Sequence, residues 1–351
     1  MSARNNSSLV TNMFRAFLIR SYLVFVFGLL AFSSCKKDIQ FPPNSIDEEL
    51  EKAIDGGFDG IILYVNQTGK ESFYSAGFDN RELQTPANPH ALFKIASMSK
   101  MYIAAAVTKL VAANELTLES TLAQLIPEVE GKIENANTIT LEMLIKHRSG
   151  IPEYIYHTDF KSDTDESYMS TLSLIYNQPA DFNPDQKYAY CNTNYLILGE
   201  ILDRTLGYSH HAFISSEILV PLSLYNTYNL YSEVDSNQVM SGYLKGYDAD
   251  LKSWDHTRPG GSMVSSAQDL GIFVRALIDG TLFSPSEQAI YSKVYEYEHT
   301  GWLPGYTSIT RYHSDIDAVV VMFVNTSSTS LFWVELEGVY DRLIYLIEKQ
   351  S

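Results

Sequence analysis

The segments with β-strand character lie near the two ends of the chain, and this restricts the folds open to it. Two β-rich stretches separated by a polar turn form GIILYVNQTGKESFYSAGFD, from residue 60, and YTSITRY and AVVVMFVNTS follow after residue 305. Most of the middle has apolar side chains at helical spacing. We therefore predict an α/β protein of the α+β type. Both chain ends build one antiparallel sheet, flanked by helices and by a mainly helical insert over about residues 98–255.

The N-terminal region has the pattern of a targeting segment. Residues 21–34, SYLVFVFGLLAFSS, carry no charge and end directly before Cys35. This stretch is shorter than the ~20 residues of a membrane-spanning helix, and it fits the apolar region of a secretory signal. Ser33 and Ser34 before the cysteine resemble a bacterial lipobox, in which the cysteine is lipidated, although Phe32 stands where Leu or Val is usual.

These features predict a division of the chain into three parts. We expect a lipoprotein signal peptide over residues 1–34, a tether over 35–45 and one folded domain over 46–351. A lipid on Cys35 would anchor the protein to a bacterial membrane in the cell envelope. An uncleaved signal anchor is the alternative, and in both cases the protein leaves the cytoplasm.

Charge and cysteine content exclude some classes of partner and bond. The formal net charge is −17 and no basic cluster interrupts it, so nucleic acid is not an expected partner. The chain has 2 cysteines. With Cys35 lipidated only Cys191 remains, so no intrachain disulfide is expected.

A serine and a lysine lie three residues apart in FKIASMSK, residues 93–100, directly before the apolar run MYIAAAVTKLVAA. Residues at this spacing share one face of a helix, so the Ser97 hydroxyl and the Lys100 amine can approach. Burial lowers the pKa of a lysine because the charged form loses its hydration. Such a lysine can accept the serine proton and create a nucleophile. The alternative is an ordinary helix start, with Ser97 or Ser99 as the cap and Lys100 exposed.

Two further motifs follow in order: YCN at residues 190–192, before an apolar helix, and HTG at residues 299–301, at the start of strand-like sequence. The S-x-x-K, Y-x-N and [KH]-T-G set resembles that of penicillin-recognising serine hydrolases. The chain thus resembles the serine β-lactamase and D-alanyl-D-alanine carboxypeptidase superfamily, in the Y-x-N branch that includes class C enzymes. LIKHRSGIP, RPGGSMVSSAQDLGIF and HTGWLPGYTS also resemble family segments, so the resemblance extends from about Asp59 to Asn325.

The resemblance implies a β-lactamase/transpeptidase-like fold and a catalytic group. Ser97 would be the nucleophile that forms an acyl-enzyme, and Lys100 would accept its proton or hold the network in place. Tyr190 would pass a proton to the leaving group. Either Lys100 or Tyr190 is open as the base for acylation.

The resemblance also implies a substrate-binding edge. Asn192 would donate its amide to the acyl-amide oxygen of the substrate, or it could serve as a helix N-cap. His299, Thr300 and Gly301 would form the strand against which the substrate lies. The backbone N–H of Trp302 would complete an oxyanion hole with that of the nucleophile.

Other histidines and the remaining cysteine are assigned simpler roles. His299 stands where many members have lysine. Because histidine is mostly neutral at pH 7, this position weakens the inference that the substrate carries a free carboxylate. His147, His157 and the pair at 210–211 lack metal-ligand spacing, so no metal or cofactor is expected, and a structural hydrogen bond is expected for His147. Cys191 is expected as a packed small side chain and not as a second nucleophile.

Together these features predict a lipid-anchored serine hydrolase that cleaves an amide or ester. Its substrate would be a small molecule or peptide. A DD-peptidase-like activity on peptidoglycan stem peptides and an esterase-like activity are both favoured over strong hydrolysis of a β-lactam. Arg258 and Arg311 are conceivable anchors for a substrate carboxylate. The alternative is a catalytically inactive member of the fold that acts as a binding or sensor lipoprotein.

Overall fold

The structure is a computed structural model, and it describes residues 44–162, 166–328 and 330–350. The predicted signal peptide and the lipidation site at Cys35 lie outside these residues. Within the described part of the chain, no helix is both long enough and apolar enough to cross a bilayer.

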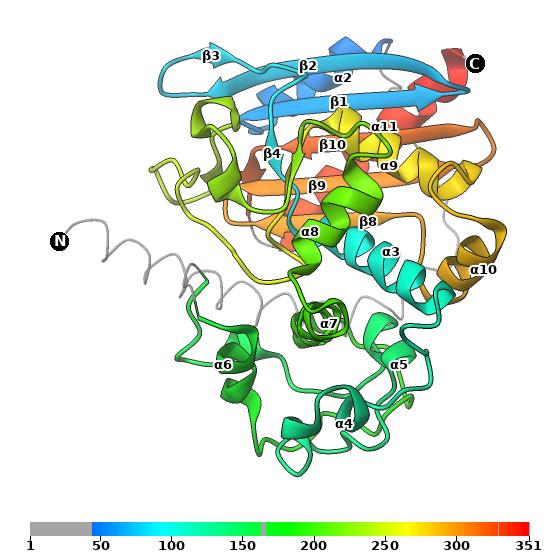
Figure 1. Cartoon of the computed structure of the whole chain (residues 1–351). Helices are drawn as coiled ribbons and strands as arrows, with labels where there is room; N and C mark the ends of the chain where they lie inside the picture. The colour runs from blue at the N-terminus through cyan, green and yellow to red at the C-terminus, as the bar shows by residue number, and fades with distance from the viewer. Residues whose placement is uncertain (1–43, 163–165, 329, 351) are drawn as a thin grey trace.

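One six-stranded sheet forms the centre of the molecule, and its neighbouring strands are all antiparallel, in the order β3-β2-β1-β10-β9-β8 (Figure 1). Its strands are β1 (Gly60–Gln67), β2 (Lys70–Asn80), β3 (Thr85–Pro86), β8 (His299–Leu303), β9 (Tyr306–His313) and β10 (Ala318–Val324). Strand β1 pairs with β10, so that Ile61 lies opposite Val324. The two ends of the chain therefore build one sheet, and the predicted fold class is confirmed.

Helices cover both faces of this sheet. Successive side chains of β1 point to opposite faces, and each set packs in a different hydrophobic cluster. Ile61 and Leu63 pack in a cluster with side chains of α2 and α11, whereas Ile62 and Tyr64 belong to the larger cluster on the other face. The two clusters contain side chains of α2 (Ile46–Asp55) and α11 (Ser330–Gln350) on one face, and of α9 (Ala267–Asp279) and α3 (Ser99–Ala112) on the other. Every residue of α3 from Ser99 to Thr108 is buried, which makes α3 the central helix of the larger cluster.

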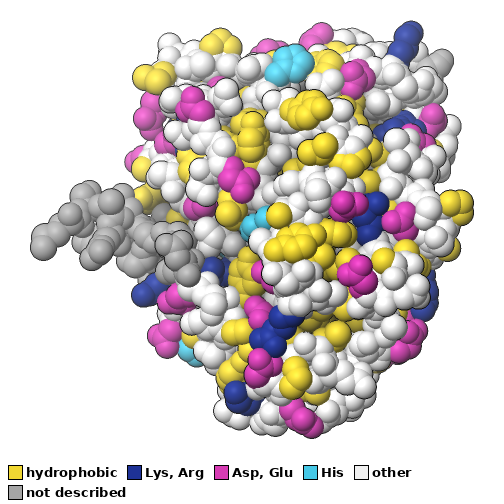
Figure 2. Space-filling model, in the orientation of Figure 1, with side chains coloured by type: hydrophobic (Ala, Val, Ile, Leu, Met, Phe, Trp, Pro, Cys, Tyr) yellow, Lys and Arg dark blue, Asp and Glu magenta, His cyan; other side chains and the backbone are white. Residues whose placement is uncertain are grey.

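A mainly helical region follows α3, and most of it lies beyond the edge of the sheet that β8 forms (Figure 1). Its helices are α4 (Leu122–Leu125), α5 (Leu141–Ile145), α6 (Tyr168–Leu172), α7 (Asn192–Leu206) and α8 (His210–Ile214), and α10 (Pro285–Val294) packs against α3. Short strands elsewhere are β4 (Phe93–Lys94), β5 (Thr227–Tyr228), β6 (Tyr243–Leu244), β7 (Val264–Ser265) and β11 (Thr326–Ser327). On the face shown in Figure 2, acidic side chains are dispersed among apolar and basic ones.

Candidate active site

Ser97 lies in a tight turn between β4 and α3. The turn is the 3-10 helix η1 (Ala96–Met98), and Ala96 has a φ of 52°, which is uncommon for a residue with a Cβ. The Ser99 hydroxyl donates to Ala96 O at 2.6 Å and accepts from the Met263 N–H at 3.2 Å. These two bonds hold the turn that presents Ser97. The serine-cap alternative is wrong, because α3 has Met98 at its N-cap and no side-chain cap bond.

Lys100 is fully buried and has three polar contacts. Its Nζ lies 3.2 Å from Ser97 Oγ, 2.9 Å from Asn192 Oδ1 and 2.7 Å from Gly260 O. Burial lowers the pKa of Lys100 to about 7, and the negative charge of Glu153 acts in the opposite direction. At neutral pH a substantial share of the lysine is therefore the uncharged amine.

The three contacts of Lys100 determine where the lone pair of that amine points. Asn192 Oδ1 and Gly260 O can only accept hydrogen bonds, whereas the Ser97 hydroxyl can also donate. A neutral amine has two N–H groups and one lone pair. When the two N–H groups bind the two acceptors, the lone pair faces the Ser97 hydroxyl, which is the arrangement needed to remove its proton.

Gly260 brings its carbonyl to Lys100 because it lacks a side chain. Its φ is +80°, and a Cβ there would lie 2.8 Å from Tyr195 Cβ and 3.1 Å from Lys100 Cγ. A residue with a side chain would therefore displace the lysine. Gly260 is absent from the set of site residues predicted from the sequence.

Tyr190 lies beside the lysine, whose Nζ is 5.0 Å from the centroid of the phenol ring. Burial raises the pKa of Tyr190 well above its usual value, and a hydrogen bond with Ser97 acts to lower it. Since 39% of the residue's surface is exposed, solvent limits the rise. The His147 ring stacks on Tyr190 at 4.5 Å between centroids, and its Nδ1 accepts from the Cys191 N–H. This bond is the structural kind expected for His147.

Cys191 is buried and its thiol donates to Ile151 O at 3.3 Å. Burial raises the pKa of this thiol, so the nucleophilic thiolate is disfavoured. The structure agrees with the packed role expected for this side chain.

Asn192 is held by Glu153. The Glu153 Oε2 atom accepts from the Asn192 backbone N–H at 2.6 Å and from Nδ2 at 3.0 Å. The N-cap alternative for Asn192 is wrong, because Asn192 is the first residue of α7 and Glu153 satisfies its N–H. Glu153 is also absent from the predicted set. The only sequence signal for it is an acidic side chain directly after the SGIP turn that resembles a family segment.

His299 is neutral in this environment. Its Nδ1 donates to the adjacent Thr300 carbonyl, which assigns the ring proton to Nδ1. Burial and the charge of Lys100 lower the pKa of His299 to about 4. The position that carries a permanent positive charge in many family members is therefore uncharged here at neutral pH.

Strand β8 lies at the edge of the sheet, directly beside the Ser97 turn. A Cβ on Gly301 would be only 2.5 Å from Ile95 O, so the glycine permits this close approach. Leu303 and Tyr306 flank the two-residue turn between β8 and β9. The alternating bonds of an antiparallel pair then point the Trp302 N–H away from β9. This arrangement fits the predicted oxyanion hole.

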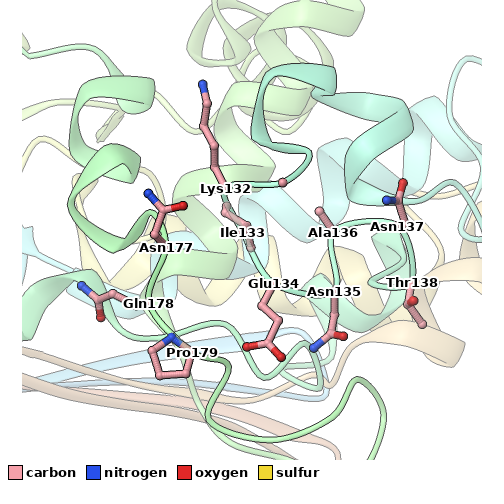
Figure 3. A pocket seen from close by; sticks show the side chains of 11 residues that line it. Lys132, Ile133, Glu134, Asn135, Ala136, Asn137, Thr138, Asn177, Gln178 and Pro179 are labelled. Atoms are coloured by element: carbon pink, nitrogen blue, oxygen red, sulfur yellow. The ribbon is translucent and has the colours of Figure 1, made fainter.

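The two arginines considered as anchors for a substrate carboxylate both donate hydrogen bonds within the protein. Arg311 pairs with Glu337 through two 2.8 Å bonds, so it is not available as an anchor for a substrate. Arg258 is buried and donates to the neighbouring Thr257 hydroxyl. The surface hollow in Figure 3 is lined by residues 131–138 and 177–179 and by none of the predicted site residues. Among the described residues, no group of three His, Cys, Asp or Glu side chains is placed to hold a metal ion.

A serine that contacts a buried lysine, beside the edge strand of a sheet built from both chain ends, defines the serine hydrolases with an S-x-x-K motif. The family model described as Beta-lactamase matches residues 46–336. The chain belongs to the β-lactamase family, as the motifs predict.

Individual relatives agree with this assignment. Penicillin-binding protein 4 of Amycolatopsis lactamdurans is 28% identical over 231 residues, which are 63% of this chain and 59% of that protein. The chain thus spans about three fifths of this relative. D-amino acid amidase from Ochrobactrum anthropi SV3 has a TM-score of 0.78 at 22% identity and covers 88% of this chain and 98% of its own. A class C β-lactamase from Rhodobacter sphaeroides has a TM-score of 0.66 at 19% identity, with 88% and 99% covered.

Proposed function

We propose that this protein is a serine hydrolase that forms an acyl-enzyme on Ser97 and cleaves an amide or an ester. The contact between Ser97 Oγ and the buried amine of Lys100 carries this proposal. The two other contacts of that amine are acceptors, so the uncharged form directs its lone pair at the serine.

We propose a reaction that uses these groups. Lys100 Nζ takes the proton of Ser97 as Oγ bonds to the carbonyl carbon of the substrate, and the carbonyl π electrons move to its oxygen. The N–H groups of Ser97 and Trp302 stabilise that oxyanion, at ~3 kcal/mol for each donor. As the C=O bond re-forms, the amine or alcohol leaves, and the proton that Lys100 took from Ser97 passes to it through the Tyr190 hydroxyl. Water then hydrolyses the ester on Ser97 and restores the serine.

Two observations support a class of substrate. Similarity to a penicillin-binding protein and to the fold of a D-amino acid amidase supports a DD-peptidase-like or other amide substrate, with an ester as the simpler alternative. The neutral His299 supports substrates that need no free carboxylate at that end of the site. We also propose that a lipid on Cys35 anchors the enzyme to the bacterial membrane. Release of Cys35→Ala protein from the membrane fraction tests this anchoring.

Labelling tests the catalytic proposal. Purified protein is treated with a fluorophosphonate and with a fluorescent penicillin, and hydrolysis is measured on D-Ala-D-Ala peptides, nitrocefin and short-chain esters. We expect label and turnover in the wild type and neither in Ser97→Ala. Equal labelling of both proteins would overturn the proposal. If neither is labelled or active, a binding role replaces it.

A further inference from the structure

We propose that Glu153 is a positioning residue for the proposed reaction: it fixes the orientation of the Asn192 amide so that Oδ1 faces Lys100. This inference rests on the proposed function, because Lys100 is the group that benefits. It adds a carboxylate to the site that contacts neither the nucleophile nor, in the proposed steps, the substrate.

The two ends of an amide side chain have the same shape but opposite hydrogen-bonding character. A carboxylate only accepts, so Glu153 requires the NH₂ end of Asn192, and their separation is 3.0 Å. The oxygen end then faces Lys100 Nζ at 2.9 Å. A flipped amide would place two acceptors together at Glu153 and two donors together at Lys100. Glu153 therefore excludes the flipped form.

Glu153 is itself held firmly. Its Oε1 accepts from the Ile155 N–H at 3.3 Å and its Oε2 from the Asn192 N–H. Burial raises the pKa of Glu153, whereas the hydrogen bonds from Asn192 and Ile155 and the charge of Lys100 act to lower it. The carboxylate also sits at the N-terminus of α7, where the helix dipole favours a negative charge.

The segment that carries Glu153 is tied to the first turn of α7 by further bonds. The Tyr154 N–H donates to Thr193 Oγ1 at 2.9 Å, and that hydroxyl donates to Pro152 O at 2.7 Å. Ser149 Oγ donates to Asn194 Oδ1 at 2.7 Å. Residues 149–155 and the start of α7 are therefore one rigid unit, and the carboxylate has little freedom to leave Asn192.

The charge of Glu153 has a second effect on the site. It acts to raise the pKa of Lys100 and, further away, the pKa of Tyr190. The other titratable groups that contact Lys100 or interact with its charge are Cys191, Tyr190, Tyr195, His147, His256 and His299. Burial lowers the pKa of each of the three histidines, so all three are uncharged at neutral pH. Glu153 is thus the charged group whose removal shifts the titration of the site.

The test is the rate at which a fluorophosphonate labels Ser97 as a function of pH. In Glu153→Gln we expect the maximal rate to fall about 10-fold or more, because the amide is no longer held in one orientation. The acid limb of the pH profile should move about one pH unit lower, because loss of the negative charge of Glu153 lowers the pKa of the base. This direction holds whether Lys100 or Tyr190 is the base. Glu49→Gln is the matched control, since Glu49 is a buried carboxylate paired with Arg342 at 2.7 Å, and it should leave both quantities unchanged.

Two more variants separate positioning from charge and guard against a folding defect. Glu153→Asp keeps the charge but is one methylene shorter, so it should lower the rate without moving the acid limb. Because Glu153 acts through Asn192, the double variant Glu153→Gln, Asn192→Ala should be no slower than Asn192→Ala alone.

The outcomes are distinguishable. Labelled wild type with an unchanged rate and pH profile in Glu153→Gln overturns the inference and leaves the proposed function intact. Additive losses in the double variant overturn it too. An unlabelled wild type overturns the proposed function instead. Thermal unfolding of each variant confirms that a folded protein is compared.

Discussion

Two buried lysines lie six positions apart in the chain, and they differ in the groups that their amines contact. Lys94, on β4, is 2% exposed and its Nζ donates to the carbonyls of Lys252, at 2.7 Å, and Trp254. It also lies 3.8 Å above the Tyr231 ring. Lys100, on α3, contacts a serine hydroxyl, an amide oxygen and one carbonyl. Burial lowers the pKa of both, to about 8 for Lys94 and about 7 for Lys100.

The comparison shows that burial of a lysine does not by itself create a catalytic group. The contacts of Lys94 are two carbonyl acceptors and the negative face of the Tyr231 ring, so loss of its proton would turn the lone pair toward that negative face. Nearby Asp250 and Asp255 also favour its charged form. Lys94 therefore remains a cation that fastens residues 252–254 to β4. Lys100 differs in one respect: one of its partners has a proton to give.

The largest expected difference between the two lysines appears when each is replaced with methionine. Lys100→Met should lower turnover by about 10³-fold or more, because no group remains to take the Ser97 proton. Lys94→Met should keep turnover near the wild-type value but lose about 2 kcal/mol of unfolding free energy, because two buried carbonyls lose their donor. Turnover on an ester and denaturant unfolding measure the two effects. Near-normal turnover in Lys100→Met would remove this lysine from the mechanism.

The next effect concerns the carbonyl that supports Lys100. Gly260→Ala should lower turnover about 100-fold, because its Cβ would press on Lys100 Cγ and Tyr195 Cβ. Gly246→Ala is the matched control, since Gly246 also has a positive φ, +88°, but nothing lies within 4 Å of its Cβ position. Gly246→Ala should keep its turnover and lose only about 1 kcal/mol of unfolding free energy. Equal turnover in the two variants would contradict the role of Gly260.

The third expected effect is on the pH dependence of acylation, which should depend on Lys100 and not on Lys94. The pKa of Lys100 is lowered from 10.5 to about 7, so its uncharged form becomes dominant as pH rises through about 7. The rate of fluorophosphonate labelling should therefore rise with pH and level off above that point. Lys94→Met should leave this limb in place. A limb that moved in Lys94→Met, or a wild-type rate independent of pH, would show that the titrating group lies elsewhere.

Local and non-local parts of the site differ in how far the sequence predicts them. The pairing of Ser97 with Lys100 follows from i,i+3 spacing, and the strands at both chain ends follow from their β-rich composition. The bond between Glu153 and Asn192 joins residues 39 positions apart, and that between Lys100 and Gly260 joins residues 160 apart. Such contacts depend on the packing of several elements, and no local pattern encodes them.

The helix-cap alternative fails for a related reason. Residue preferences favour a serine at an N-cap, and FKIASMSK offers two. The chain instead forms a 3-10 turn with Ala96 at positive φ, a conformation that local preferences disfavour. Strand β7 and the segment before it impose this turn, since Met263 binds the hydroxyl of Ser99. Tertiary packing therefore overrides the local signal at the residue that carries the chemistry.

The smallest expected effect on turnover is that of Ser99→Ala, and its comparison with Ser97→Ala distinguishes the two serines on either side of Met98. Ser99→Ala removes one bond to Ala96 O and one from the Met263 N–H, so it should lower the unfolding free energy by about 1–3 kcal/mol. It leaves the nucleophile and Lys100 in place, so a substantial part of the turnover should remain, whereas Ser97→Ala should have none. Turnover per folded molecule, with unfolding measured in parallel, makes the comparison. Comparable losses in the two variants would mean that the geometry of the turn, and not the Ser97 hydroxyl alone, limits the reaction.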